Sequence, residues 1–153
     1  MTAVSSRSLW HRWRFRLNGF LLILPLWYIY LALTPEFPAA WPEKSVGPVS
    51  AIPMPADYDP PYAHEDIFVK DFYLHLCEGC MDKIRTAYLN IGTEPLPISE
   101  RIEGVVHGNR FSQEAHAVSP PQIGPDDKLW MTVQDWSGRI HHAWWDLSWA
   151  ESE

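Results

Sequence analysis

The two cysteines of the chain stand three positions apart in Cys77-Glu78-Gly79-Cys80. In an oxidising compartment, thiols at this spacing can close a disulfide across a turn, and Gly79 supplies the backbone freedom that the turn requires. Cys77 and Cys80 are therefore predicted to form a disulfide. A thioredoxin-like redox motif would open a helix in an α/β pattern, whereas the residues before this motif alternate like a strand. Covalent c-type haem attachment requires a histidine after the second cysteine, and that position is Met81.

His75 makes metal binding the alternative chemistry of this motif. It lies two residues before Cys77, on the same face of the expected strand, so His75, Cys77 and Cys80 could supply three ligands. A single CxxC without a second pair is a weak zinc signal, and no cofactor beyond this candidate ion is predicted. Five further histidines offer ring nitrogens, namely His64, His107, His116, His141 and His142.

Other reaction classes find no support in the sequence. It contains no G-x-S-x-G, H-E-x-x-H, P-loop or G-x-G-x-x-G pattern. Residues 17–153 hold all 19 acidic residues of the chain, so nucleic acid is an unfavourable partner for this part. The expectation is a protein that is not an enzyme.

The elements that position these residues read as mainly β. Residues 67–77 alternate apolar and polar side chains, as a half-buried strand does. Residues 83–91 predict a second strand, although a short helix also fits there. Residues 102–106 and 111–118 flank a hairpin turn at 107–109. The prediction for residues 64–153 is a small antiparallel β-sandwich or partial barrel of about five to seven strands.

The clearest β unit is a hairpin over residues 129–147, with Ser137-Gly138 at its turn. If Trp136 and Arg139 flank that turn, Trp130 lies opposite Trp145. Both faces of such a hairpin carry tryptophan. One face can fill a core, and the other must be covered by a neighbour.

The N-terminal part has a different character. Residues 1–16 contain four arginines and no acid, and residues 17–33 contain no charge. The uncharged run spans roughly 25 Å as a helix, near the lower limit for a bilayer. An uncleaved transmembrane helix is predicted, with a cleavable signal peptide and a buried helix of a water-soluble domain as alternatives. The basic flank places residues 1–16 in the cytoplasm and the domain at 64–153 in the periplasm of a bacterial inner membrane.

Residues 34–63 connect these parts and are rich in proline. Eight prolines fall between Pro35 and Pro61. Such a segment is expected to be extended rather than a helix or a central strand. Apolar residues are interleaved among the prolines, which favours a strap laid across another protein over a plain linker.

These features together predict a non-enzymatic accessory subunit of a larger integral membrane complex, anchored in the lipid bilayer. A periplasmic metal or thiol-redox protein that uses the CxxC with His75 is the alternative, and an anchored domain that binds a small ligand is a third. Exposed aromatic side chains are the expected docking anchors. These are Trp27, Tyr28, Tyr30, Trp41, Trp130, Trp136, Trp144, Trp145 and Trp149.

Three stretches resemble a little-characterised group of bacterial single-pass membrane proteins with a periplasmic CxGC-containing domain. They are residues 12–19, residues 70–89 and Trp136-Ser137-Gly138. Some members of that group are labelled thiamine-pyrophosphate-binding, but this sequence lacks the Gly-Asp-Gly and downstream Asn-Asn that hold magnesium diphosphate. The resemblance implies a companion of a membrane electron-transfer or metal-uptake assembly. The expected larger complex is accordingly an electron-transfer, photosynthetic or metal-uptake one.

Overall fold

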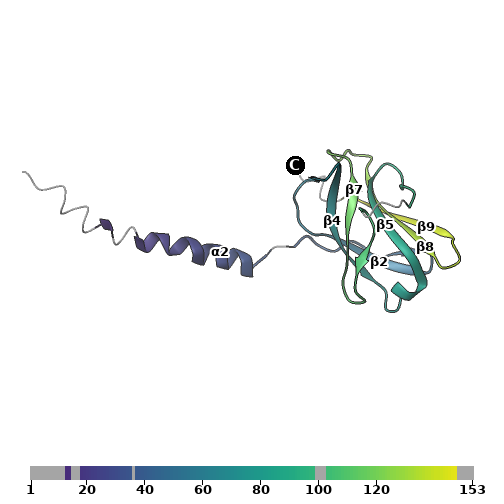
Figure 1. Cartoon of the computed structure of the whole chain (residues 1–153), viewed down its shortest axis with the longest axis horizontal. Coiled ribbons are helices and arrows are strands. Elements are labelled where there is room, and N and C mark those ends of the chain that lie inside the picture. The colour runs from purple at the N-terminus through teal and green to yellow at the C-terminus, as the bar shows by residue number, and fades with distance from the viewer. Residues whose placement is uncertain (1–12, 15–17, 36, 99–102, 148–153) are drawn as a thin grey trace, which may run out of the picture. The chain divides into compact units, whose positions relative to one another are not determined.

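The computed structural model describes residues 13–14, 18–35, 37–98 and 103–147. The chain forms two units, Met1–Glu36 and Phe37–Glu153. Figure 1 shows both units, coloured along the chain.

The first unit contains α2 (Ile23–Leu33), which follows a helical stretch at residues 18–21 and a turn at Leu22. Pro25 explains the interruption, because proline has no N–H to donate to the Leu21 carbonyl and its ring crowds that oxygen. In the first turn of α2 the missing donor is harmless. Within the described residues, no helix combines the length and the apolar character needed to cross a bilayer. The transmembrane helix predicted for 17–33 is therefore not supported.

The second unit is a sheet whose described part contains nine strands, more than the five to seven expected. They are β1 (Lys44–Val46), β2 (Val49–Pro55), β3 (Tyr62–His64), β4 (Ile67–Leu76), β5 (Ile84–Gly92), β6 (His107–Gly108), β7 (Gln113–Ser119), β8 (Lys128–Asp135) and β9 (Ile140–Asp146). The strands predicted at 67–77 and 83–91 correspond to β4 and β5. A single 3₁₀ turn, Met81–Lys83, precedes β5.

The strand order is β1-β2-β4-β7-β5-β8-β9, with β3 added to β4 and β6 to β7. All pairs are antiparallel except the single parallel bridge between β5 and β7. The sheet curls until β1 approaches β9, which makes a nearly closed barrel (Figure 1). The Lys44 ammonium donates to the Trp144 carbonyl at 2.6 Å, and the Trp145 indole donates to the Pro42 carbonyl at 2.7 Å. The mainly β prediction is confirmed, and the barrel is the form that the sheet takes.

The core lies inside the curled sheet. Val46, Phe72, Leu89, Met131 and Trp145 each come from a different strand, and all are buried. They belong to one continuous apolar cluster. Burial of such side chains is the main force that closes a small sheet on itself.

The proline-rich segment supplies β1, β2 and β3, so part of the expected tether belongs to the sheet. The expected boundary between residues 63 and 64 falls inside β3. The Ser50 carbonyl accepts from the Cys77 N–H just after β4, and the Ala56 N–H donates to the Asp71 carbonyl of β4. The Pro53 carbonyl instead points away from β4 and accepts from the Trp41 backbone N–H at 2.8 Å. Pro55 lies two residues further along β2, so its nitrogen, like that of Pro53, points away from β4. At these two positions β4 needs no N–H donor from β2. For that reason prolines are tolerated in a paired strand.

The β8–β9 hairpin is confirmed, but its predicted register is wrong by one residue. Trp130 pairs with Trp144, and Leu129 pairs with Trp145. The turn has three residues, because the Asp135 N–H donates to the Arg139 carbonyl and Gly138 adopts a φ of 85°. A left-handed third residue is typical of such loops. The shift moves one strand's side chains to the opposite face relative to the prediction.

The hairpin predicted around 107–109 also differs. Its turn lies at residues 109–112, and the strand expected at 102–106 reduces, in its described residues, to one bridge between Val105 and Tyr88. Gly104 explains this difference, since its φ of 84° breaks the extended backbone, and a Cβ there would lie 2.5 Å from the Tyr88 ring.

Candidate functional site

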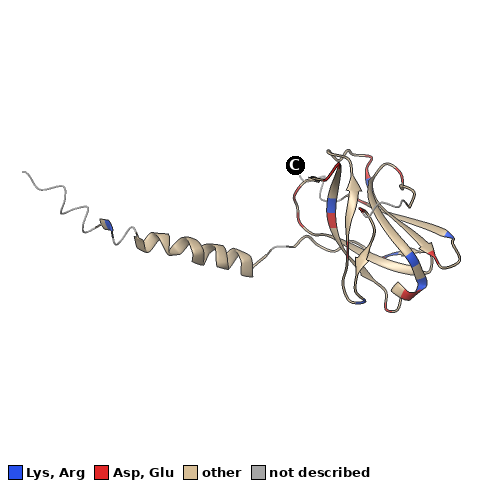
Figure 2. Cartoon of the chain, in the orientation of Figure 1, with Lys and Arg blue, Asp and Glu red and all other residues tan. Residues whose placement is uncertain are grey.

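Four turns meet at one end of the barrel, which we call the disulfide end. They comprise residues 47–48, 77–83, 109–112 and 136–138. The strand registers bring them together, because Ala51 pairs with Leu76, Leu74 with Gln113, and Ile84 with Asp135. Charged residues lie mainly on turns and strand ends, with Lys70 and Asp71 inside β4 as exceptions, and α2 carries none (Figure 2).

A disulfide between Cys77 and Cys80 closes the turn after β4. The Cys80 N–H donates to the Cys77 carbonyl at 3.0 Å, and Gly79 has the φ of 70° that this turn requires. The Cys77 sulfur accepts the Ser50 N–H at 3.1 Å. Cys80 is fully buried against the core. The disulfide therefore ties the turn both to β2 and to the barrel interior.

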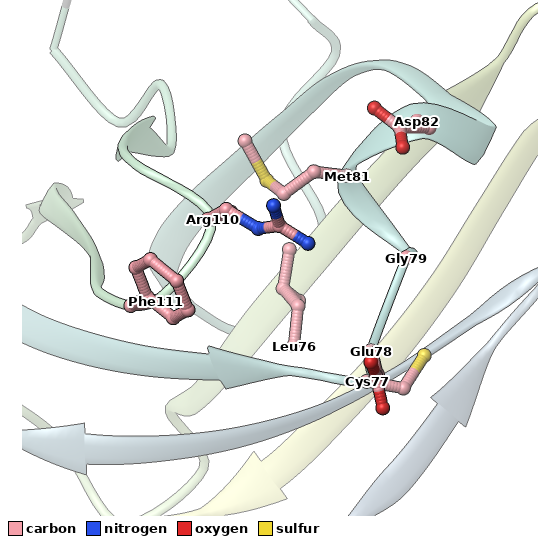
Figure 3. Close-up of a pocket in the computed structure, with 8 residues that line it drawn as sticks. All are labelled: Leu76, Cys77, Glu78, Gly79, Met81, Asp82, Arg110 and Phe111. Atoms are coloured by element: carbon pink, nitrogen blue, oxygen red, sulfur yellow. The ribbon is translucent and has the colours of Figure 1, made fainter.

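A cavity of about 510 Å³ opens beside this turn. Its lining residues are Leu76, Cys77, Glu78, Gly79, Met81, Asp82, Arg110 and Phe111. Figure 3 shows Arg110 reaching over Leu76 toward Met81, while the Cys77 sulfur points away from Arg110 and Phe111. The Arg110 guanidinium lies 5.3 Å from the centre of the Phe111 ring. Phe111 itself is 79% exposed.

Trp136 stands at the tip of the β8–β9 turn on the same end of the barrel. Its side chain is 69% exposed, although its indole N–H donates to the Asp82 carbonyl at 2.9 Å. This hydrogen bond fixes the ring beside the disulfide turn and leaves its faces to solvent. Exposed aromatic rings held in one orientation bind a partner with little loss of conformational entropy.

Asp135 holds the turn that carries Trp136. Its carboxylate accepts hydrogen bonds from the Ser137 N–H and hydroxyl at 2.8 and 2.5 Å and from the His141 ring at 3.1 Å. The Arg139 N–H and side chain also donate to it, at 3.1 and 3.2 Å. The hydrogen bonds from Ser137 and His141 hold the pKa of Asp135 well below its ordinary value. The turn is thus rigid.

The structure does not assemble the predicted metal site from His75, Cys77 and Cys80. Both sulfurs are joined in the disulfide, so neither is a thiolate, and His75 is exposed on β4. Among the described residues, no three His, Cys, Asp or Glu side chains are already placed to hold an ion. The His141 ring hydrogen-bonds to the Asp135 carboxylate instead, and the His142 ring contacts the Thr132 hydroxyl at 3.0 Å.

The nine predicted aromatic anchors divide by burial. Trp41 and Trp145 are core residues, so they are not available to a partner. Trp130 is half-buried and donates to the Gly92 carbonyl, whereas Trp144 lies beneath the Lys44 and Lys128 ammonium groups at 4.2 and 3.7 Å. Trp149 lies outside the described residues. The exposed anchors are Trp27, Tyr28, Tyr30, Trp136 and, at 37% exposure beneath the two lysines, Trp144.

The sequence did not identify Arg110, Phe111 and Met81 as residues of this site. Asn109 could have indicated a turn at Arg110 and Phe111, because its side chain accepts the Phe111 N–H at 2.8 Å, as turn asparagines do. Lys70 was also missed. It is buried within β4 and reaches the Asp57 carboxylate and the Asp59 carbonyl.

Fold and site together define a small, nearly closed antiparallel barrel with a disulfide-fastened end that presents aromatic side chains. The chain belongs to the family described as uncharacterised conserved protein UCP029505, which matches residues 9–148. No curated protein matches the chain. No solved structure matches it either.

Proposed function

We propose that the protein is a non-enzymatic accessory subunit of a larger integral membrane complex, and that its disulfide end docks on an extracytoplasmic surface of that complex. The supporting observation is the pair of exposed rings, Phe111 and Trp136, beside Met81 and Arg110. Aromatic residues, methionine and arginine are the types enriched at protein interfaces. The Asp135 hydrogen bonds and the Trp136 bond to the Asp82 carbonyl hold the Trp136 ring in place before binding, which reduces the entropic cost of association.

The membrane part of the proposal rests on residues 17–33. No charged residue occurs in this run, and no residue of α2 is buried. A helix that is apolar on every side requires an apolar surrounding, and the arginines at 1–16 favour the cytoplasmic side of a bilayer. Although no described helix has by itself the length and apolar character of a span, we propose that residues 17–33 lie in a bacterial inner membrane, with the barrel in the periplasm. The resemblance to single-pass membrane proteins supports the same arrangement, with an electron-transfer, photosynthetic or metal-uptake complex as the partner.

The partner surface follows from the chemistry of the disulfide end. It must offer an apolar recess for Phe111 and Trp136, and a carboxylate for the Arg110 guanidinium. A basic group opposite Glu78 or Asp82, which line the same cavity, would complete the charge pattern. Nucleic acid does not satisfy this description, because its phosphates would face those acids.

The test is purification of the tagged full chain from its native membrane in mild detergent. The expected result is co-migration with a specific integral membrane protein at a fixed ratio. Phe111→Ala and Trp136→Ala should each weaken this association at least about tenfold, as loss of an interface anchor does. Tyr58→Ala is the matched control, because Tyr58 is 63% exposed and lies in the segment between β2 and β3, outside the disulfide end. A lone monomer in mild detergent, or release of the chain from membranes by carbonate, would contradict the proposal.

A thiol-redox protein is the second candidate. The observation that favours it is the Ser50 N–H on the Cys77 sulfur, since a donor at this position stabilises a thiolate after reduction. Equilibration of the full chain with a dithiol buffer, followed by thiol titration, tests it. Reversible reduction of the native fold supports this candidate, and resistance to reduction until the chain unfolds contradicts it.

A further inference from the structure

Three histidines that are distant in the sequence converge on the outer face of the barrel. His64 comes from β3, His107 from β6 and His116 from β7. The ring centres of His64 and His116 lie 5.8 Å apart, and those of His107 and His116 are also 5.8 Å apart. His64 and His107 are exposed, and His116 is partly exposed. We call these three residues, with Asp71 and Glu114, the histidine cluster.

The hydrogen bonds of two of these rings select one tautomer. Nδ1 of His116 lies 2.6 Å from an Asp71 carboxylate oxygen, and Nδ1 of His107 lies 3.1 Å from the Val105 carbonyl. Both oxygens can only accept, so each Nδ1 must donate its proton. Nε2 is then the nitrogen that presents a lone pair in the neutral ring. Histidines that bind metals in proteins are oriented in the same way, by a carboxylate or carbonyl on the second nitrogen.

Asp71 is itself held in position. The Tyr62 hydroxyl lies 3.1 and 3.2 Å from its two carboxylate oxygens and donates to the carboxylate. The hydrogen bond from Tyr62 to Asp71 and the one from His116 to Asp71 therefore fix the orientation of the His116 ring.

The charges around the cluster favour a cation. Asp71 contacts His116, and a Glu114 carboxylate oxygen lies 3.4 Å from Nε2 of His107. As the rings stand, His64 and His116 are stacked with 17° between their planes, and the described residues contain no ready-made three-ligand site. An ion would therefore have to turn the exposed His64 and His107 rings toward His116. The turned His107 ring would give up its hydrogen bond to the Val105 carbonyl, so His116 is the ring whose orientation is set beforehand.

We propose that the histidine cluster binds one divalent transition-metal ion of the zinc class. Imidazole nitrogens with a carboxylate are ligands that Zn²⁺, Cu²⁺ and Ni²⁺ accept, whereas Mg²⁺ and Ca²⁺ prefer oxygen. Nε2 of His116 is the central ligand, the turned His64 and His107 rings supply two more, and Glu114 offers an oxygen. This site is separate from Cys77 and Cys80, and it does not depend on the proposed function.

The test is titration of the purified, oxidised full chain with ZnCl₂ in detergent, by calorimetry and by competition with a chromogenic chelator. The expected result is saturation at about one ion per chain and a rise in unfolding temperature with zinc concentration. His116→Gln and Asp71→Asn should each weaken zinc binding by tenfold or more, the latter because loss of a carboxylate behind a ligand has that effect. If His116→Gln fails to fold, zinc binding is measured in His64→Gln and His107→Gln instead. Both side chains are exposed, so these variants should fold, and each should bind zinc more weakly.

Two controls separate this site from other zinc ligands. His75→Gln replaces an exposed histidine of β4 outside the cluster and should leave zinc affinity unchanged. The double variant Cys77→Ser, Cys80→Ser should also retain binding. Absence of saturable binding below millimolar zinc overturns the proposal, as does an equal loss of affinity in the His75 variant. Co-migration with a membrane partner is measured independently, so the two proposals can fail separately.

Discussion

At the scale of the residue, hydrogen bonding decides which polar side chains position the disulfide end. Asp135 illustrates this, because one carboxylate accepts from Ser137, Arg139 and His141 and holds the turn that carries Trp136. The sequence showed a turn at Ser137-Gly138 but not this role for Asp135. His141 was likewise visible only as one of several scattered histidines.

Asp135 predicts a pH dependence of stability. Its pKa is lowered from an ordinary value of 3.8, so its contribution is complete above that pH and is lost as the pH falls toward the folded-state pKa. Asp135→Asn should therefore lower the unfolding temperature at pH 7, and its deficit relative to wild type should shrink as the pH drops below 3.8. Thermal unfolding from pH 7 to pH 3 measures this. Asp126→Asn, at an exposed position, is the control, and a deficit independent of pH would contradict the assignment.

At the scale of the element, two glycines show how turns decide the register and the closure of the sheet. Gly138 has a φ of 85° with open space around it. Gly47, in the β1–β2 turn, has a φ of 61°, and a Cβ there would lie 2.3 Å from the His141 ring of β9. At position 138 glycine is needed only for the left-handed backbone. At position 47 the missing side chain also leaves the room that lets β1 approach β9.

Alanine at these two positions should separate the two requirements. Gly138→Ala should cost about 1–2 kcal/mol of unfolding free energy, the strain of a left-handed non-glycine residue. Gly47→Ala should cost clearly more, because the added methyl group also collides with His141 and opens the seam between β1 and β9. Urea denaturation of both variants measures the difference. Equal losses would show that His141 moves aside freely and that the seam does not depend on Gly47.

At the scale of the whole molecule, the segment before β1 is part of the barrel. Trp41 is buried and lies edge-on to Phe72, with ring centres 5.6 Å apart. The backbone N–H of Trp41 donates to the Pro53 carbonyl, and the indole N–H of Trp145 donates to the neighbouring Pro42 carbonyl. Residues expected to lie across another protein therefore complete the core of their own chain.

Trp41→Ala should destabilise the protein by about 3–5 kcal/mol, as removal of a large buried ring does. Trp136→Ala, at an exposed position, should change the unfolding free energy by less than about 1 kcal/mol while weakening the proposed docking. Denaturant unfolding of the full chain distinguishes the two tryptophans. A stable Trp41→Ala protein would restore the interpretation of this segment as a tether.

The sequence by itself determined the mainly β character, the positions of β4, β5 and the β8–β9 hairpin, and the spacing that permits the Cys77–Cys80 disulfide. These properties depend on alternation, turn residues and chain distance, all of which are local. Only the tertiary structure decided that the backbone nitrogen and carbonyl of Pro53 point away from β4. It also decided that Trp41 and Trp145 are core residues while Trp136 is exposed, and that the rings of His64, His107 and His116 converge. Each of these depends on which strands become neighbours and in what register, and a shift of one residue reverses the face of every side chain in a strand.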